Sequence, residues 1–334
     1  MRDERLKNDE KYMQRCLHLA RCGEVGAAPN PMVGAVVVHN GRIIGEGFHR
    51  RCGGPHAEVN AIASVHDPSL LPDSTIYVSL EPCAHFGKTP PCADLIIEKG
   101  IKRIVVGCRD SFDKVDGLGI QKLRDAGREV TVGVLEQECL DLNRRFFTFH
   151  TKKRPYITLK WAQSADGFIA RKGERTTLST STTMTLVHRL RALNDAILVG
   201  GQTVVVDNPS LTVREWTGKN PLRIVVDTRA SLKEMEGLRS FDTEAETLVW
   251  TNWNLDALME ELYHRGVQRL LVEGGATTLR RFLKAGLWDE ARIETASVEL
   301  GGGIAAPMLS AARLVKKRSF GSNTVYTYRP VRTK

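Results

Sequence analysis

Short apolar runs rich in β-branched residues alternate with helical segments along this chain. Strands are predicted at 34–38, 75–79, 103–106 and 129–134, with helices at 57–65, 93–99, 120–126 and 136–149. Further on, strands are predicted at 156–160, 196–199, 222–226, 247–250 and 269–272, with helices at 182–193 and 256–265. Such alternation is typical of mostly parallel α/β sheets. A hairpin is the exception, since Asn40-Gly41 joins the run at 34–38 to Ile43-Ile44.

The length of the chain predicts two domains. Its 334 residues exceed the usual size of one domain. The segment Lys152-Lys153-Arg154-Pro155 interrupts the helical pattern before the next strand begins. We therefore place the boundary near residue 150, with domains at 1–150 and 151–334.

Composition and charge narrow the class of protein. No apolar run approaches the roughly 20 residues of a membrane helix, and the first residues lack the apolar core of a signal peptide. The seven cysteines are an odd number in a large chain, which argues against a disulfide framework. We expect a cytoplasmic protein with no membrane partner.

The formal net charge of +9 indicates an anionic partner, either a nucleic acid or a phosphorylated ligand. The basic residues are scattered and aromatic residues make up only 6% of the chain. Nucleic-acid binders usually concentrate cations together with stacking aromatics. We therefore expect a phosphorylated small molecule and no nucleic acid. The sequence leaves open whether the protein forms a homo-oligomer.

Four residues between positions 56 and 92 form a candidate hydrolytic metal site. His56, Cys83 and Cys92 are one imidazole and two thiols, and Glu58 is a carboxylate two residues after His56. A catalytic zinc site needs three protein ligands, an open position for water and a carboxylate that moves protons. The pattern His-x-Glu with Pro-Cys pairs is that of zinc nucleobase deaminases. We expect each cysteine to lie at a turn from a strand into a helix.

Two alternatives stay open at this point. His85 lies between the cysteines and could complete a structural zinc clip with four protein ligands. The eight residues between Cys83 and Cys92 are also unusual, since nucleoside and tRNA deaminases normally have two. Lys88 within this gap favours a phosphorylated substrate.

The second half offers a weaker signal. Val272-Glu273-Gly274-Gly275 follows a predicted strand and opens a helix, where backbone amides can hold a phosphate. The chain has no Gly-x-Gly-x-x-Gly, which argues against a Rossmann domain.

With these motifs the chain resembles the bifunctional deaminase/reductase family of riboflavin biosynthesis. The resemblance rests on Asn30 to Val38, His56-Ala57-Glu58-Val59 and Glu81-Pro82-Cys83 through Cys92-Ala93. In the second half it rests on Ser164-Ala165-Asp166-Gly167, Asp207 to Arg214 and Val272 to Gly275. It implies an α/β chain with a cytidine-deaminase-like three-layer domain followed by a dihydrofolate-reductase-like domain.

The resemblance also implies the reactions. The first domain would use one Zn²⁺ to deaminate 2,5-diamino-6-(5-phosphoribosylamino)pyrimidin-4-one, with Glu58 as the proton carrier. The second would use NADPH to reduce the ribosyl group to ribityl, with Asp207 as the proton donor.

The resemblance also implies site residues, at the positions of this sequence that match the family's motifs. The deaminase substrate would contact Asn30, His49, Lys88 and Asp110. The reductase substrate would contact Arg191, Leu211, Arg214 and Glu273. NADPH would contact Ala162, Thr203, Asp207, Thr228, Gly275, Ala276, Thr277, Thr278, Leu279, Arg280 and Arg281.

The chain departs from the family pattern in both halves. Arg175 stands where the family has a small hydroxyl residue near the substrate, and Thr177 where it has an aromatic residue near the cofactor. Asp110-Ser111-Phe112 replaces Asp-Pro-Asn. Two alternatives to the bifunctional enzyme are a nucleoside or tRNA deaminase, and a deaminase whose reductase-like domain is a scaffold.

Overall fold

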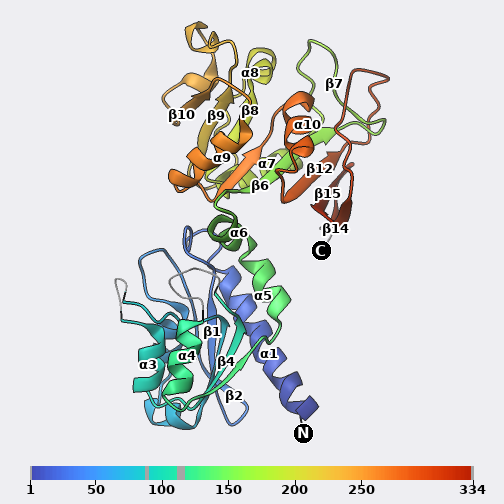
Figure 1. Ribbon diagram of the computed structural model, residues 1–334. Coiled ribbons are helices and arrows are strands. Elements are labelled where there is room, and N and C mark those ends of the chain that lie inside the picture. The colour runs from blue at the N-terminus through green and yellow to red at the C-terminus, as the bar shows by residue number, and fades with distance from the viewer. Residues whose placement is uncertain (1, 87–89, 111–116, 332–334) are drawn as a thin grey trace. The chain divides into compact units, whose positions relative to one another are not determined.

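The computed structural model describes residues 2–86, 90–110 and 117–331, and the chain divides into two compact units, Met1–Lys152 and Lys153–Lys334. Lys88, Ser111 and Phe112 lie outside the described residues. No helix in the described ranges combines the length and apolarity that a membrane crossing requires. Each unit contains one large sheet with helices on both faces (Figure 1).

The first unit is built on a five-stranded sheet in the order β2-β1-β3-β4-β5. β1 pairs antiparallel with β2 and with β3, whereas β3, β4 and β5 pair in parallel. The prediction of a mostly parallel sheet is therefore wrong for this unit. The strands are β1 (Gly34–His39), β2 (Arg42–Phe48), β3 (Thr75–Leu80), β4 (Arg103–Cys108) and β5 (Glu129–Val132).

Side chains of alternate residues in these strands point to opposite faces and form two cores. Val37 belongs to one core and Val36 to the other. The Val37 core is covered by α2 (Ala57–Ala63), α3 (Cys92–Glu98) and α4 (Leu118–Asp125). The Val36 core is covered by α1 (Arg2–Arg21) and α5 (Glu136–Leu142). The unit therefore has three layers, with a 3-10 turn η1 (Pro68–Asp73) before β3.

Two local predictions have different outcomes. The hairpin is confirmed, because Asn40 and Gly41 both have positive φ (48° and 73°), as a tight two-residue turn requires. The prediction of a single helix at 136–149 is wrong, because the helix is interrupted at Asn143 and divides into α5 and α6 (Arg144–Lys152). The Asn143 side chain bonds the Met32 backbone instead, accepting from N and donating to O at 2.8 Å each.

The second unit contains an eight-stranded sheet in the order β10-β9-β8-β11-β6-β12-β15-β14. The first six strands in this order pair in parallel, which confirms the prediction, and the last two pair antiparallel. The strands are β6 (Tyr156–Gln163), β8 (Ala196–Gly200), β9 (Leu222–Val226), β10 (Thr247–Trp250), β11 (Arg269–Val272), β12 (Glu290–Thr295), β14 (Ala312–Phe320) and β15 (Asn323–Pro330). A two-stranded sheet joins β7 (Phe168–Ala170) and β13 (Ile304–Ala305).

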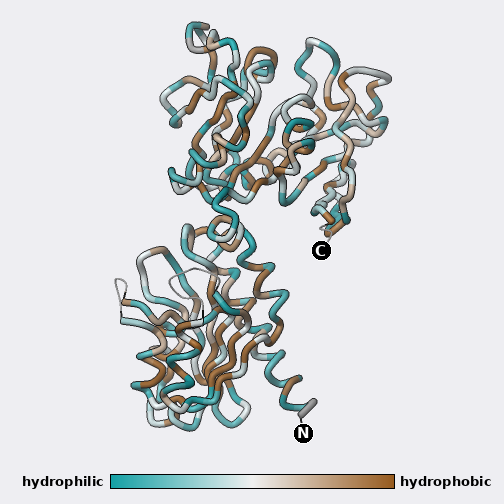
Figure 2. The backbone as a smooth tube through the Cα atoms, viewed as in Figure 1, coloured by the Kyte–Doolittle hydropathy of each residue, from teal (hydrophilic) through white to brown (hydrophobic). Residues whose placement is uncertain are grey.

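Helices cover both faces of this sheet. They are α7 (Ser181–Ala192), α8 (Gly201–Asp207), α9 (Leu255–His264) and α10 (Ala276–Lys284), with 3-10 turns η2 (Leu232–Glu234) and η3 (Arg239–Phe241). α7 begins with a capping box, in which Thr180 and Thr183 exchange side chain to backbone hydrogen bonds. Figure 2 shows the hydrophobic residues concentrated along the strands of both units.

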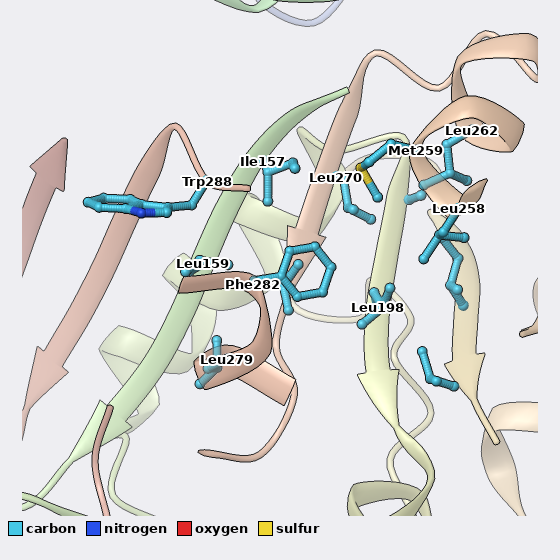
Figure 3. Close-up of a cluster of buried hydrophobic side chains, with 14 of the residues drawn as sticks. Ile157, Leu159, Leu198, Leu258, Met259, Leu262, Leu270, Leu279, Phe282 and Trp288 are labelled. Atoms are coloured by element: carbon cyan, nitrogen blue, oxygen red, sulfur yellow. The ribbon is translucent and has the colours of Figure 1, made fainter. Parts of the chain in front are cut away.

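The larger core of the second unit lies between the sheet and α9 and α10. Phe282 from α10 is fully buried against residues of β6, β8 and β11, among them Leu159, Leu198 and Leu270 (Figure 3). All five tryptophans of the chain belong to the second unit, so their fluorescence reports on this unit alone.

Replacing Phe282 tests this core. We expect Phe282→Ala to lower the free energy of unfolding of the second unit by about 3–5 kcal/mol, because it removes a buried ring and leaves a cavity. Urea unfolding followed by tryptophan fluorescence measures this. Val298→Ala is the control, because Val298 is 53% exposed and should change the free energy by less than about 0.5 kcal/mol. Equal effects of the two changes would contradict this account.

Candidate metal centre and a second pocket

The three candidate metal ligands of the first unit come together from separate elements. His56 is the residue before α2, Cys92 is the first residue of α3, and Cys83 follows β3. Cys83 lies in irregular chain, so only Cys92 opens a helix as predicted. Their ligand atoms all lie within 4.8 Å of one another. The fold thus brings His56 together with two cysteines that lie 27 and 36 residues away in the sequence.

The spacing of these atoms fits a tetrahedral zinc ion. His56 Nδ1 lies 3.5 Å from Cys83 Sγ and 3.3 Å from Cys92 Sγ. Tetrahedral bonds of about 2.0 Å to nitrogen and 2.3 Å to sulfur would place these atoms about 3.5 Å apart. Within the described ranges His85 does not join this group, and its side chain is exposed. Three protein ligands are the number of a catalytic site, which leaves one position open.

The charges around the ligands favour metal binding. The hydrogen bond from Cys92 lowers the pKa of Cys83, while the hydrogen bond with Cys83 and burial raise the pKa of Cys92. The Cys92 backbone N–H also donates to Cys83 Sγ at 3.3 Å. A thiolate is the form that binds metal, and these contacts stabilise it at Cys83.

Glu58 lies beside these ligands, in the first turn of α2. Its side chain is buried and makes a hydrogen bond with Cys92. Burial raises the pKa of Glu58 to about 7. A carboxyl group with a pKa near neutrality can both accept and return a proton, which suits general acid–base chemistry.

His49 adjoins the candidate metal ligand His56, and Asn30 contacts His49. His49 Nε2 lies 3.1 Å from Asn30 Nδ2, and His49 Nδ1 lies 3.1 Å from the Pro55 carbonyl oxygen. Since the amide and the carbonyl fix the tautomer, Nδ1 donates and Nε2 accepts. The His49 ring meets the His56 ring edge to face, with centroids 5.4 Å apart. Burial lowers the pKa of His49.

Asp110 lies just after β4 and is 6% exposed. Its backbone N–H donates to the buried Glu81 carboxylate at 3.2 Å. Sequence reasoning did not select Glu81 as a site residue, although the signal was present: an acidic residue at the end of a buried strand, directly before Pro82-Cys83.

The second unit holds a pocket of about 600 Å³ at the carboxyl ends of its parallel strands. It gathers most of the residues matched to the reductase site, which are Ala162, Arg191, Thr203, Asp207, Leu211, Arg214, Glu273, Gly275, Ala276, Thr277 and Thr278. Arg175 and Thr177, the two departures from the family pattern, also line it.

Four of the matched residues do not line this pocket. Leu279 is fully buried in the core under α10, and Thr228 is exposed after β9. Arg280 donates to the Ala305 carbonyl at 2.6 Å, and the Arg281 guanidinium lies 4.7 Å from the Trp253 ring centroid.

An ion pair organises one wall of the pocket. Arg191 of α7 donates to Glu273 after β11, at 2.7 Å from Nη2 and 3.3 Å from Nε. Arg191 Nη1 also donates to the Thr212 carbonyl at 3.2 Å, and Arg214 Nη1 donates to Thr212 Oγ1 at 3.0 Å. Burial favours a protonated Glu273, but the charges of Arg191 and Lys160 and the hydrogen bond from Arg191 act together against it, and the pKa of Glu273 is lowered. This wall therefore carries two arginines. The charge of Arg191 is neutralised by Glu273, and Arg214 is available to bind an anion.

Another part of the pocket lining is a cradle of backbone at two helix N-termini. Gly275 precedes α10, and its N–H donates to Thr203 Oγ1 in α8 at 3.1 Å. A Cβ atom on Gly274 would lie 2.7 Å from the Thr278 side chain, and one on Gly200 would lie 2.6 Å from Thr278 Oγ1. Only glycine permits this approach. Residues at the starts of α8 and α10 line the pocket, and a helix N-terminus is a site that suits the phosphates of a nucleotide.

Asp207 lies at the end of α8 on the pocket wall. Burial raises the pKa of Asp207, while the charge of Arg175 acts in the opposite direction. The arginine that replaces a small hydroxyl residue therefore acts on the candidate proton donor.

Comparisons with known proteins match a domain model to each unit. The RibD C-terminal domain model matches residues 155–327, and the model of the cytidine and deoxycytidylate deaminase zinc-binding region matches residues 6–108. Riboflavin biosynthesis protein RibD of Aquifex aeolicus is 40% identical, with 89% of each chain covered. That of Escherichia coli is 35% identical, with 88% of this chain and 89% of the relative covered.

This chain belongs to the RibD family. It carries the deaminase and the reductase domain of that bifunctional family, which confirms the predicted cytidine-deaminase-like and dihydrofolate-reductase-like folds. Its first domain is one of the zinc-binding deaminases. Membership supports the two-domain enzyme of riboflavin biosynthesis over a nucleoside or tRNA deaminase.

Solved structures of RibD proteins extend this likeness over the whole chain. The diaminohydroxyphosphoribosylaminopyrimidine deaminase/5-amino-6-(5-phosphoribosylamino)uracil reductase of Thermotoga maritima is 37% identical with a TM-score of 0.88, covering 98% of this chain and 99% of that one. Acinetobacter baumannii RibD is 31% identical with a TM-score of 0.87, covering 98% and 100%.

The metal centre can be tested without turnover. We expect Cys92→Ser to lower zinc affinity by more than about 100-fold, because losing a ligand exceeds the 10- to 100-fold cost of losing a group that only orients one. Competition against a chromogenic chelator measures the affinity. Cys22→Ser is the control, since Cys22 is an exposed thiol outside the site. Unchanged affinity in the Cys92 variant would show that the metal binds elsewhere.

Proposed function

We propose that this chain deaminates 2,5-diamino-6-(5-phosphoribosylamino)pyrimidin-4-one in its first domain and reduces the ribosyl side chain of the product to ribityl in its second. The observation that carries the proposal is the convergence of His56, Cys83 and Cys92 beside the buried carboxyl group of Glu58. Its support is membership in a family whose two domains both match this chain.

In the deaminase, His56, Cys83 and Cys92 would hold one zinc ion. When bound, the ion would supply a Lewis acid that lowers the pKa of an attacking water from about 15.7 toward about 7. Glu58 would carry the two protons of this water in turn, the first to the ring nitrogen and the second to the leaving amine, which departs as ammonia. Asn30, His49 and Asp110 orient the pyrimidine, and Lys88 is matched to its phosphate.

In the reductase, the amides at the start of α10 and the Thr203 hydroxyl would hold NADPH, which supplies the hydride. From the resemblance of their positions to the family, Thr228, Leu279, Arg280 and Arg281 would also contact the cofactor. Arg214 binds the substrate phosphate, and the Arg191–Glu273 pair fixes the adjoining wall. Asp207 donates the proton that opens the sugar ring, because burial keeps a carboxyl group protonated to higher pH.

Product analysis with and without NADPH tests both halves. Incubating protein, zinc and the diaminopyrimidine should release ammonia in either case, and the ribityl product should form only with NADPH. A chain that deaminates but neither binds nor oxidises NADPH would have a reductase-like scaffold. Deamination of cytidine or tRNA, with none of the pyrimidine, would overturn the proposal.

Glu58→Gln tests the proton carrier. We expect ammonia release to fall by about 10²- to 10⁴-fold, because the amide cannot transfer the proton. Zinc content should not change, since Glu58 is not a ligand. Reduction of the deaminated pyrimidine by the same protein is the internal control, measured as NADPH oxidation. Full ammonia release by this variant would exclude the role given to Glu58.

Arg175→Ser tests the departure in the reductase pocket. Reduction requires protonated Asp207, so activity is present below the Asp207 pKa and is lost as pH rises through it. The charge of Arg175 lowers this pKa. Removing that charge should therefore move the alkaline loss of kcat/KM for reduction to higher pH. Arg171→Ser is the matched control, because Arg171 lines the same pocket. A shift to lower pH, or the same shift in both variants, contradicts this role.

A further inference from the structure

The carboxylate of Glu81 is the meeting point of several backbone segments in the first unit. Glu81 follows β3, lies two residues before Cys83 and is 4% exposed. Its Oε2 accepts the N–H groups of Asp110 at 3.2 Å and Gly117 at 3.0 Å. Its Oε1 accepts those of Gly119 at 3.0 Å and Ile120 at 3.2 Å. One side chain thus binds the chain after β4 and the start of α4.

Glu81 acts as the cap of α4. Gly117 precedes this helix with φ of 86°, and it has no side chain that could cap the first turn. The first amides of a helix have no partner inside the helix. Glu81 supplies acceptors for three of them from another element of the fold.

A second contact joins the same two elements. A Cβ atom on Gly119 would lie 1.8 Å from the Pro82 carbonyl oxygen, so the helix backbone lies directly on the turn before Cys83. Glu81 and Pro82 therefore hold α4 at two adjacent points. Both points are within two residues of a metal ligand, and the same carboxylate binds the backbone of Asp110.

We propose that Glu81 is a positioning residue of the deaminase, which holds the substrate contact Asp110 at a fixed place relative to Cys83. This inference rests on the proposed function, since it assigns Asp110 to the substrate. Without the carboxylate, Asp110 and α4 shift while His56, Cys83 and Cys92 keep their own contacts. Substrate binding then weakens more than metal binding does.

Glu81→Gln is the test, because glutamine keeps the size of the side chain but its amide nitrogen cannot accept an N–H. We expect KM for deamination to rise about tenfold while kcat changes less than about threefold, with zinc content unchanged. A lower kcat with unchanged KM indicates a smaller folded fraction, and this result overturns the proposal.

Asp9→Asn is the matched control. Asp9 is also a buried carboxylate of the first unit with 4% exposure. It accepts from Arg103 at 2.6 Å and 3.0 Å and from Tyr77 at 2.8 Å, and neither partner belongs to the site. We expect Asp9→Asn to lower stability and to leave KM for deamination unchanged.

Two further measurements separate this inference from the proposed function. Reduction of the deaminated pyrimidine by the Glu81→Gln protein should match the parent protein, which shows that the second unit is intact. Amide hydrogen exchange at Gly117, Gly119 and Ile120 should be faster in Glu81→Gln and unchanged in Asp9→Asn. If the parent protein releases no ammonia, the proposed function fails. In that case amide hydrogen exchange alone tests the inference, and unchanged protection of these amides in Glu81→Gln overturns it.

Discussion

Parallel pairing of strands is the constraint on which both sites depend. The carboxyl ends of parallel strands meet at one edge of a sheet, and the residues that follow them are brought together there. β3 and β4 are parallel neighbours, so Cys83 and Asp110 emerge at the same edge of the first sheet. β8 and β11 are parallel neighbours in the second, so α8 and the Gly275 cradle meet. The antiparallel strands of each sheet lie outside these junctions.

Buried charges in both units are paired or hydrogen-bonded, and each arrangement has a consequence for the adjoining site. Arg191 and Glu273 neutralise each other on the pocket wall and leave Arg214 for an anion. Glu81 is bound by four backbone amides. Glu58 differs, since burial raises its pKa to about 7 although the charge of His56 acts in the opposite direction. That contrast separates the carboxylates that hold the structure from the one suited to move a proton.

The sequence predicted the strands of the parallel regions well because their β-branched runs are continuous and buried on both faces. It predicted α5 and α6 as one helix, because the helical pattern continues through Asn143 and the bonds to Met32 are visible only in the fold. The antiparallel pairing of β1 with β3 was missed for the same reason, since strand order depends on contacts between distant residues. Family likeness, and not periodicity, selected Asn30 and His49, and the fold then places Asn30 against His49 and His49 beside His56.

The sequence by itself determined the chemical groups of the metal centre, the class of both domains and the family, because these depend on residue type, spacing and local periodicity. Only the tertiary structure decided which groups meet. It brought His56 and Cys92, which are 36 residues apart in the sequence, to a contact of 3.3 Å. It placed the Glu81 carboxylate against backbone amides as many as 39 residues away. It also placed Arg175 in the pocket with Asp207, and left Thr228 and Leu279 off its wall. These outcomes depend on packing and strand pairing between residues far apart in the chain, which a local pattern does not encode.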